Sequence, residues 1–97
     1  MDLGNTIKNF RKQKELKQGE FAKKCGISQT YLSLIENNQK EPNISTLKEI
    51  SIQLDVPLPI LFFQSLTDED IPSKKRKAFK IIGPSVKSLI NEFFAIQ

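Results

Sequence analysis

The chain has 97 residues, of which 38% are hydrophobic and 27% are charged, so it is long enough for one domain with a modest core. It contains one cysteine and no histidine, which excludes an internal disulfide, a histidine-based catalytic site and the usual structural zinc sites. The formal net charge is +4 and the pI is about 9.3, which favours a polyanionic partner without requiring one.

The first part of the chain is predicted to form two short helices. Apolar residues at three- and four-residue intervals predict a helix over residues 3–13. A second helix is expected over residues 18–25. Lys17 precedes it at the N-cap position, and because lysine has no side-chain oxygen we expect a weak cap there.

A tight turn and a third helix follow. Gly26 permits the left-handed conformation that ends a helix, and Ser28 is a good N-cap for a helix that runs to about Asn37. Residues 18–36 therefore have the size and layout of a helix-turn-helix, whose second helix can enter the DNA major groove. Cys25 is expected to be a small core residue, because no histidine is present to activate its thiol. The inward positions of this unit are Phe21, Ala22, Cys25, Ile27, Leu32 and Ile35.

Two more helices complete the first 66 residues. Asn38 lies in the loop that follows the third helix and tolerates a positive φ better than most residues. Asn43 is expected to cap a fourth helix, and Pro57 or Pro59 to open a fifth. The buried positions expected in these helices are Leu47, Ile50, Leu54, Leu61 and Phe62.

The composition changes after Leu66. Residues 67–73 have the character of an acidic capping or linker segment, and residues 74–77 form a basic run, KKRK. We interpret the basic run as a solvated helix face balanced by the acidic segment; phosphate binding and recruitment of an acidic partner are the alternatives. Gly83 and Pro84 are expected to separate two helical pieces, because proline is disfavoured inside a helix and glycine suits its end.

An apolar stripe marks the last helical piece. It carries more apolar surface than two short helices bury against each other. Three uses are open: a lid on the N-terminal domain, a dimer interface, or a dock for another protein. Dimerisation is favoured, because a single recognition helix contacts few base pairs, whereas a two-fold dimer contacts two half-sites about 34 Å apart. The residues of the stripe are Val86, Leu89, Ile90, Phe93 and Phe94.

The first two thirds of the chain resemble the phage-repressor and Cro (XRE) type of helix-turn-helix family, a class of bacterial and phage transcription regulators. The resemblance implies an all-α fold with a five-helix DNA-binding domain over residues 1–66. The apolar spacing of the remaining residues predicts one or two further helices over residues 67–97. The family pattern does not extend into residues 65–97. The similarity runs from Ile7 to Phe63 through Arg11, Leu16, Gln18, Phe21, Ala22, Gly26, Ile27, Ser28, Leu32, Ser33, Ile35, Glu36, Pro42, Leu47, Ile50, Leu54, Val56, Leu61 and Phe62.

The resemblance also implies which residues contact base edges. Gln29, in the first turn of the recognition helix, is placed to pair with adenine N6 and N7. Thr30 and Ser33 are candidates for hydrogen bonds to bases, and the Thr30 methyl for contact with a thymine methyl. Leu34 departs from the family, which commonly has a polar residue there; an exposed leucine would contact thymine methyls or indicate a different use of this face.

Phosphate contacts and one ion pair follow from the same resemblance. Arg11 is expected to pair with Glu36 and to orient two helices; the alternative is two independent solvated charges. Tyr31 is a candidate for a phosphate contact through its hydroxyl or for packing against the start of the second helix. The other phosphate candidates are Gln18, Asn37 and Lys40, with Lys8, Lys17 and Lys24 as additions.

These features predict a homodimeric, sequence-specific transcription regulator, most simply a repressor, that binds double-stranded DNA and needs no cofactor. One alternative is the DNA-binding antitoxin of a toxin-antitoxin pair, whose C-terminal segment masks a toxin. The other is an interaction module that binds a protein partner through Leu34 and the C-terminal helices. An enzyme is not expected, because no paired catalytic acids or phosphate-cradling glycine loop occur. Lacking a signal-peptide pattern or a stretch of ~20 apolar residues, the protein is expected in the cytoplasm, not in a membrane.

Overall fold

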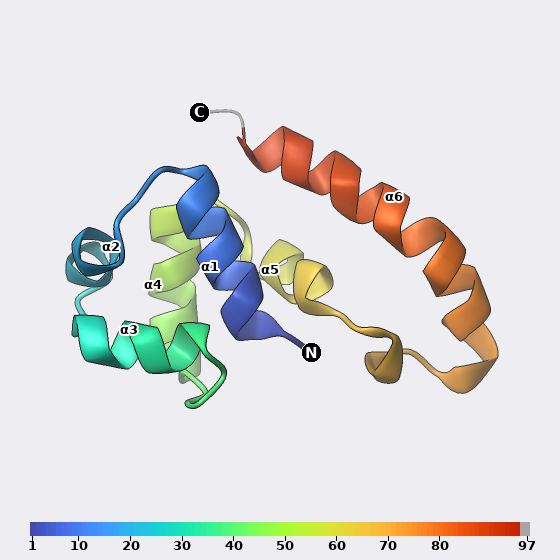
Figure 1. Ribbon diagram of the computed structural model, residues 1–97, viewed down its shortest axis with the longest axis horizontal. Helices are drawn as coiled ribbons and strands as arrows, with labels where there is room; N and C mark the ends of the chain where they lie inside the picture. The colour runs from blue at the N-terminus through green and yellow to red at the C-terminus, as the bar shows by residue number, and fades with distance from the viewer. Residues whose placement is uncertain (96–97) are drawn as a thin grey trace.

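The computed structural model describes residues 1–95, in which every regular element is a helix and there is no strand (Figure 1). This confirms the all-α prediction. Ile96 and Gln97, which end the predicted C-terminal segment, lie outside the described residues. The elements are α1 (Leu3–Gln13), α2 (Gln18–Lys24), α3 (Gln29–Glu36), α4 (Ile44–Leu54), α5 (Leu58–Ser65), the short 3₁₀ helices η1 (Asp68–Asp70) and η2 (Ser73–Lys75), and α6 (Arg76–Ala95).

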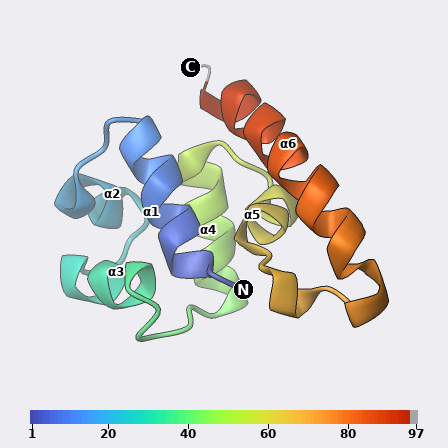
Figure 2. The ribbon, with the colours of Figure 1, turned by 45° about the vertical axis from the view of Figure 1, so that its right-hand side comes forward.

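Helices α1 to α5 pack around one hydrophobic core. Helix α1 lies at the centre of this group and contacts α3, α4 and α5 (Figure 2). The inward positions predicted for these helices are buried, except Ile27 and Phe62, which are half-buried and pack against the core. The apolar periodicity of this part of the chain is therefore confirmed. The buried apolar residues are Ile7, Phe10, Phe21, Ala22, Cys25, Leu32, Ile35, Leu47, Ile50, Leu54, Val56 and Leu61.

The helix caps follow the predicted side chains. The Ser28 hydroxyl accepts a hydrogen bond from the Tyr31 N–H at 3.0 Å, and the Asn43 side chain accepts one from the Thr46 N–H at 2.8 Å. Lys17 makes no side-chain capping bond at the start of α2. The good caps of α3 and α4 and the weak cap of α2 are therefore confirmed.

Left-handed backbone occurs at four positions among residues 1–95. Gly26 has φ +71° in the turn between α2 and α3, and Asn38 has φ 59° in the loop after α3, as predicted. Glu15 and Asp55 also have positive φ, 57° and 56°, after α1 and α4. Asp55 belongs to a residue type that adopts positive φ more often than most, whereas no sequence signal marks Glu15.

Gly4 lies where the start of α1 crosses the end of α3. A Cβ at this position would overlap the carbonyl oxygen of Ile35 and lie 2.8 Å from that of Glu36. The Gly4 N–H also donates to Asn38 Oδ1 at 2.9 Å. Only glycine therefore fits this crossing, although it stands inside a helix.

We expect Gly4→Ala to lower the free energy of unfolding by about 1–3 kcal/mol, because the clash outweighs the ~1 kcal/mol that alanine usually adds to helix stability. Urea denaturation followed by circular dichroism measures the change. Gly19→Ala is the matched control, since its Cβ would meet only the flexible end of the Gln29 side chain, at 3.0 Å. Equal stability of Gly4→Ala and the parent protein would contradict the close crossing.

Helix α6 is a single continuous helix of 20 residues (Figures 1 and 2). The prediction that Gly83 and Pro84 separate two helical pieces is therefore wrong. A proline removes one hydrogen bond and can be accommodated within a long helix, usually with a kink. Gly83 is buried, and a Cβ there would lie 3.2 Å from the Phe79 ring, so this glycine serves packing within α6 instead of ending a helix.

A few polar contacts attach α6 to the five-helix domain. The Gln64 amide donates to the Lys87 carbonyl at 3.1 Å and to Asn91 Oδ1 at 3.2 Å. The Lys87 ammonium donates to the Leu66 carbonyl at 2.5 Å. Phe94 packs against the edge of the core. No helix among residues 1–95 has the length and apolar character to cross a membrane.

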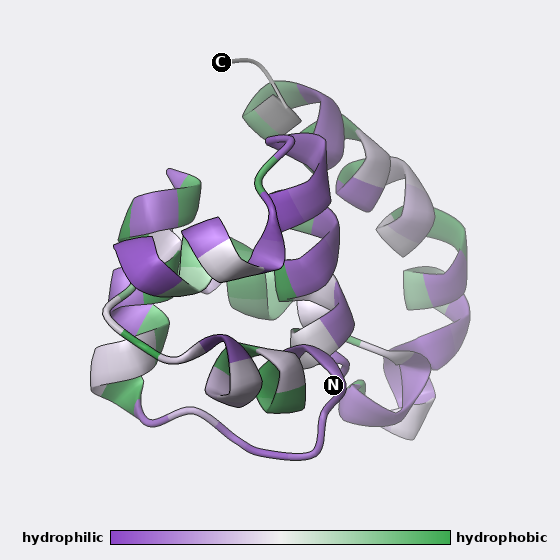
Figure 3. Ribbon diagram, turned by 60° about the vertical axis from the view of Figure 1, so that its left-hand side comes forward, coloured by the Kyte–Doolittle hydropathy of each residue, from purple (hydrophilic) through white to green (hydrophobic). Residues whose placement is uncertain are grey.

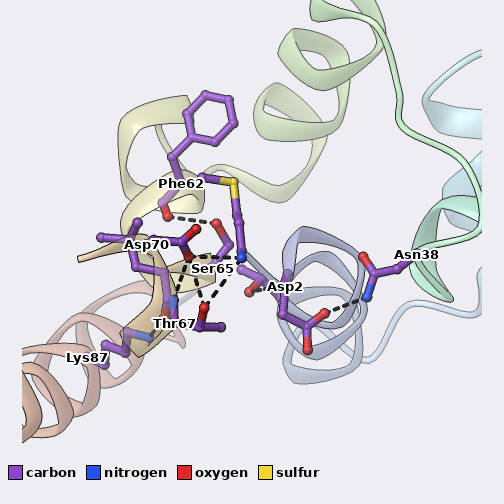
Figure 4. A network of polar contacts seen from close by, with 10 residues as sticks. Asp2, Asn38, Phe62, Ser65, Thr67, Asp70 and Lys87 are labelled. Atoms are coloured by element: carbon purple, nitrogen blue, oxygen red, sulfur yellow. Dashed lines mark hydrogen bonds and ion pairs between the residues drawn. The ribbon is translucent and has the colours of Figure 1, made fainter. Parts of the chain in front are cut away.

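The start of the chain is held against the segment that leads to α6 (Figure 4). The Met1 ammonium lies 2.9 Å from Asp70 Oδ2, and the Asp2 N–H donates to the Ser65 carbonyl at 2.7 Å. Asp70 also accepts a hydrogen bond from the Thr67 N–H at 2.8 Å, which completes a capping box at η1. The acidic segment therefore caps its own short helix, as predicted.

These contacts lower the pKa of Asp70 from its ordinary 3.8 to about 2, mainly through the Thr67 N–H and then through the Met1 ammonium. Because the folded-state pKa is the lower one, the stabilisation is complete above the ordinary value and is lost as the pH falls through about 2. A carbon-detected NMR titration should place the Asp70 midpoint near 2. Thr67→Val, which keeps the N–H, should move it little, and a wild-type midpoint at 3.8 would contradict the capping geometry.

Candidate nucleic-acid interface

Helices α2 and α3 pack against each other and leave one side of α3 in solvent. Phe21 and Ala22 of α2 are buried against Leu32 and Ile35 of α3, and the turn at Gly26 joins the two helices. Small Ala22 allows the helices to cross closely. The long loop after α3 is hydrophilic (Figure 3).

The predicted base-contacting residues divide into two pairs. Gln29 and Thr30, in the first turn of α3, are exposed, whereas Ser33 and Leu34, one turn later, are half-buried. The expectation of an exposed leucine at position 34 is therefore met only in part. The loop after α3 folds back on this turn, with the Gln39 and Lys40 N–H groups donating to the Leu34 carbonyl at 2.8 and 3.2 Å. The first turn is thus the freest part of α3.

Gln29 is connected to the interior by a chain of hydrogen bonds. Its amide donates to Gln18 Oε1 at 3.4 Å, and the Gln18 amide donates to Glu36 Oε1 at 3.0 Å. The bond from Gln29 is long and exposed, so it is weak enough to be exchanged for a better partner. Gly19 leaves room beside the Gln29 side chain, a role that no local sequence pattern reveals.

Arg11 and Glu36 form a buried, bidentate ion pair. Arg11 Nε donates to Glu36 Oε2 at 2.7 Å and Arg11 Nη2 donates to Oε1 at 3.0 Å, while Nη1 donates to the Leu16 carbonyl at 2.7 Å. The side chains are only 8% and 1% exposed, so they are not independent solvated charges. The pair joins α1, the α1–α2 connection and the last turn of α3, and it fixes the orientation of α3.

The predicted phosphate-contacting residues lie at both ends of α3. Asn37 and Lys40 are exposed beyond its C-terminal end. Tyr31 is half-buried and packs against the hydrophobic core. Gln18 is half-buried and hydrogen-bonded to Glu36, so its amide already has a partner. The remaining candidates, Lys8, Lys17 and Lys24, range from half-buried at Lys8 to exposed at the other two.

The basic run at residues 74–77 is exposed and spans the end of η2 and the start of α6, at the far end of the molecule from α3 (Figures 1 and 2). It therefore does not add charge to the α3 face. The acidic segment is reached by Lys80 instead, whose ammonium lies 3.7 Å from Asp68 in an exposed pair.

Cys25 is a buried core residue. Desolvation raises the pKa of its thiol to about 11, with the nearby Glu49 carboxylate adding to the effect, so the thiolate is scarcely populated near neutral pH. Among residues 1–95, no three His, Cys, Asp or Glu side chains come together in a group suited to a metal ion.

Comparison with known proteins agrees with this geometry. The helix-turn-helix family profile matches residues 7–61. Over 59 residues the chain is 49% identical to the ImmF control region 10 kDa protein of Bacillus phage phi105, covering 61% of this chain and 66% of that protein. Over 60 residues it is 42% identical to the HTH-type transcriptional regulator SinR of Bacillus subtilis (strain 168), covering 61% and 54%.

A longer alignment reaches beyond the five-helix domain. The chain is 36% identical over 90 residues to the Immunity repressor protein of Bacillus phage phi105, covering 92% of this chain and 62% of that protein, and so includes much of α6. The chain spans between 54% and 66% of the length of these three relatives. No solved structure matches it. The chain belongs to the helix-turn-helix family of DNA-binding transcription regulators, in its phage-repressor (XRE) type.

Proposed function

We propose that this protein is a sequence-specific DNA-binding regulator that inserts the first turn of α3 into the major groove. The proposal rests on one observation: α3 is held in place at its C-terminal end and carries exposed polar side chains at its N-terminal end. The buried Arg11–Glu36 pair holds the end of α3, while Gln29 and Thr30 are exposed at its start. A rigid support with adaptable polar side chains at its end is suited to contact with base edges.

Gln29 is the principal base-contacting residue in this proposal. Its amide offers a donor and an acceptor, the combination that pairs with adenine N7 and N6. On binding, its 3.4 Å bond to Gln18 would be exchanged for bonds to the base. Thr30 beside it supplies a hydroxyl and a methyl group, and Ser33 and the half-buried Leu34 follow on the next turn.

Backbone contacts come from the residues around the two helices. The exposed Asn37 and Lys40 lie where they can contact a phosphate as α3 enters the groove. The free N–H groups at the start of α2 are a second phosphate site. Gln18 can donate its amide N–H to a phosphate there only by rotating away from Glu36. These contacts give affinity and register but no sequence preference.

The protein acts as a homodimer and, most simply, as a repressor. One recognition helix covers too few base pairs for useful specificity, whereas a two-fold dimer covers an inverted repeat. Two relatives from the same phage are named as an immunity repressor and as a control-region protein, which supports repression here. Such a regulator works where the DNA is, in the cytoplasm, and uses no cofactor.

Selection of bound sequences from a random DNA pool, at near-physiological salt, tests this proposal. Non-specific contacts weaken at that salt concentration, so base contacts dominate enrichment. We expect an inverted repeat with half-sites about one helical turn apart. Folded protein that enriches no sequence would contradict specific DNA binding and direct attention to a protein partner.

A further inference from the structure

The outward face of α6 is the strongest unexplained surface of this chain. Ile81, Ile82, Leu89 and Phe93 are 69%, 59%, 66% and 67% exposed, and Ala78 and Ser85 beside them are exposed as well. At about 100° per residue these six side chains cover roughly a third of the circumference of the helix. Hydrophobic stretches recur along α6 in Figure 3. Isolated exposed apolar residues are ordinary, but a stripe along one helix indicates an interface.

The other side of α6 is already used by the domain. Gly83 is buried, and Phe79, Val86, Ile90 and Phe94 are half-buried on that side. The predicted interface stripe is therefore divided: Leu89 and Phe93 face outward, whereas Val86, Ile90 and Phe94 are partly covered. One side of α6 covers the domain, as the lid suggested by the sequence would, and the opposite side remains exposed for an interface.

We propose that a second copy of this chain covers the outward face, with the two α6 helices antiparallel and the two-fold axis passing through Ser85. This inference rests on the homodimer of the proposed function and specifies how it is built. The stripe is nearly symmetric about Ser85. Ile81 and Leu89 lie four residues before and after it, and Ala78 and Phe93 lie seven before and eight after.

This symmetry makes the face complementary to itself in shape. A two-fold axis at Ser85 places Ile81 and Ile82 against Leu89 of the partner subunit, so that branched side chains fill the space on both sides of the axis. It also places the small Ala78 against the large Phe93 of the partner subunit. The two serines meet at the axis, where small residues allow two helices to approach closely.

Charge favours the antiparallel arrangement over the parallel one. Glu92 lies inside the arc of the stripe and Lys77 lies just beyond its edge on the same side, near the opposite end. Both are exposed, and neither forms an ion pair among residues 1–95. The antiparallel pair brings Lys77 close to Glu92 of the partner subunit, twice. A parallel two-fold pair would instead place the two lysines at one end and the two glutamates at the other, on opposite flanks of the interface, and would bring no opposite charges together.

Cysteine cross-linking without DNA tests this geometry. Ser85→Cys should give a disulfide-linked dimer under mild oxidation, because the axis brings the two Cβ atoms within disulfide range. Leu89→Cys alone should not, since the two copies of residue 89 lie about 12 Å apart along the helix pair. A mixture of Ile81→Cys and Leu89→Cys proteins should cross-link. The parent protein controls for the buried Cys25, and Ser45→Cys controls for random collision on α4.

Sedimentation equilibrium of the intact chain gives an independent measurement. Leu89→Glu should raise the dimer dissociation constant at least tenfold, because it places a charge against apolar residues on both sides of the axis. Lys77→Glu and Glu92→Lys should each weaken the dimer, and combining them should restore it. Ile52→Glu is the matched control, because Ile52 of α4 is 67% exposed and lies outside the proposed α6 interface.

Three results would overturn the inference. They are self-linking of Leu89→Cys as efficient as that of Ser85→Cys, a dimer weakened by Ile52→Glu but not by Leu89→Glu, or a protein that stays monomeric at all concentrations. None of these measurements uses DNA. A failure of the interface is therefore distinct from a failure of specific binding, which the DNA selection reports.

Discussion

Replacing Arg11 with alanine is expected to lower the free energy of unfolding by about 3–5 kcal/mol, the usual result when one partner of a buried ion pair is removed. The Glu36 carboxylate would remain buried, 1% exposed, with only the Gln18 amide as a side-chain partner. The Leu16 carbonyl would also lose its bond. Because small domains are stable by about 5–15 kcal/mol, a loss of this size should bring the protein close to unfolding at 37 °C.

Urea denaturation at pH 7, followed by circular dichroism, measures this loss. Arg11→Lys keeps the charge but not the bidentate geometry, so it should lower the free energy of unfolding by less than Arg11→Ala does. Its stability can therefore be measured even if Arg11→Ala does not fold. Lys80→Ala is the control, because it breaks only the exposed pair with Asp68 and should cost at most ~1 kcal/mol. A loss below 1 kcal/mol for Arg11→Ala would show that the pair does not hold α3.

Replacing Gln29 with alanine is expected to reduce affinity for the preferred DNA site by about 1–3 kcal/mol and to leave affinity for random DNA nearly unchanged. The side chain is exposed and its one bond, to Gln18, is 3.4 Å long, so the variant should fold normally. Fluorescence anisotropy with the selected site and with a shuffled duplex gives both affinities. Equal losses on the two DNAs would contradict a base contact at Gln29.

Lys40→Ala is the matched comparison. Lys40 is exposed beyond the end of α3 and is proposed to contact phosphate, so its removal should weaken binding to both DNAs alike. The slope of log affinity against log salt should become shallower by about one. A sequence-dependent loss for Lys40→Ala would instead make it a base-contacting residue.

The sequence predicts the five-helix domain well because its signals are local. The Ser28 and Asn43 caps, the Gly26 turn and the apolar periodicities each depend on residues within a few positions of one another, and all are found in the structure. The positions of Arg11 and Glu36 were available only through the family resemblance. They lie 25 residues apart, and no local pattern relates them.

The features that the sequence did not predict depend on contacts between distant segments. Gln18 was assigned to a phosphate, but the fold brings it to Glu36, 18 positions later. Gly4 looks like an ordinary helical glycine until α3 crosses it. The Gly83–Pro84 pair has the local character of a helix end, yet α6 continues through it. Helical periodicity identified the apolar residues of α6 but could not show which of them the domain covers.

The proposed role of the first turn of α3 is tested most directly by the ratio of the affinities for the selected DNA site and for shuffled DNA. The intact chain would be titrated, at near-physiological salt, with its selected inverted repeat and with a shuffled duplex of the same composition. Specific regulators bind their sites at least about 1,000-fold more tightly than random DNA, and this is the predicted result. Equal affinities for the two duplexes, measured with folded protein, would contradict sequence-specific binding by α3.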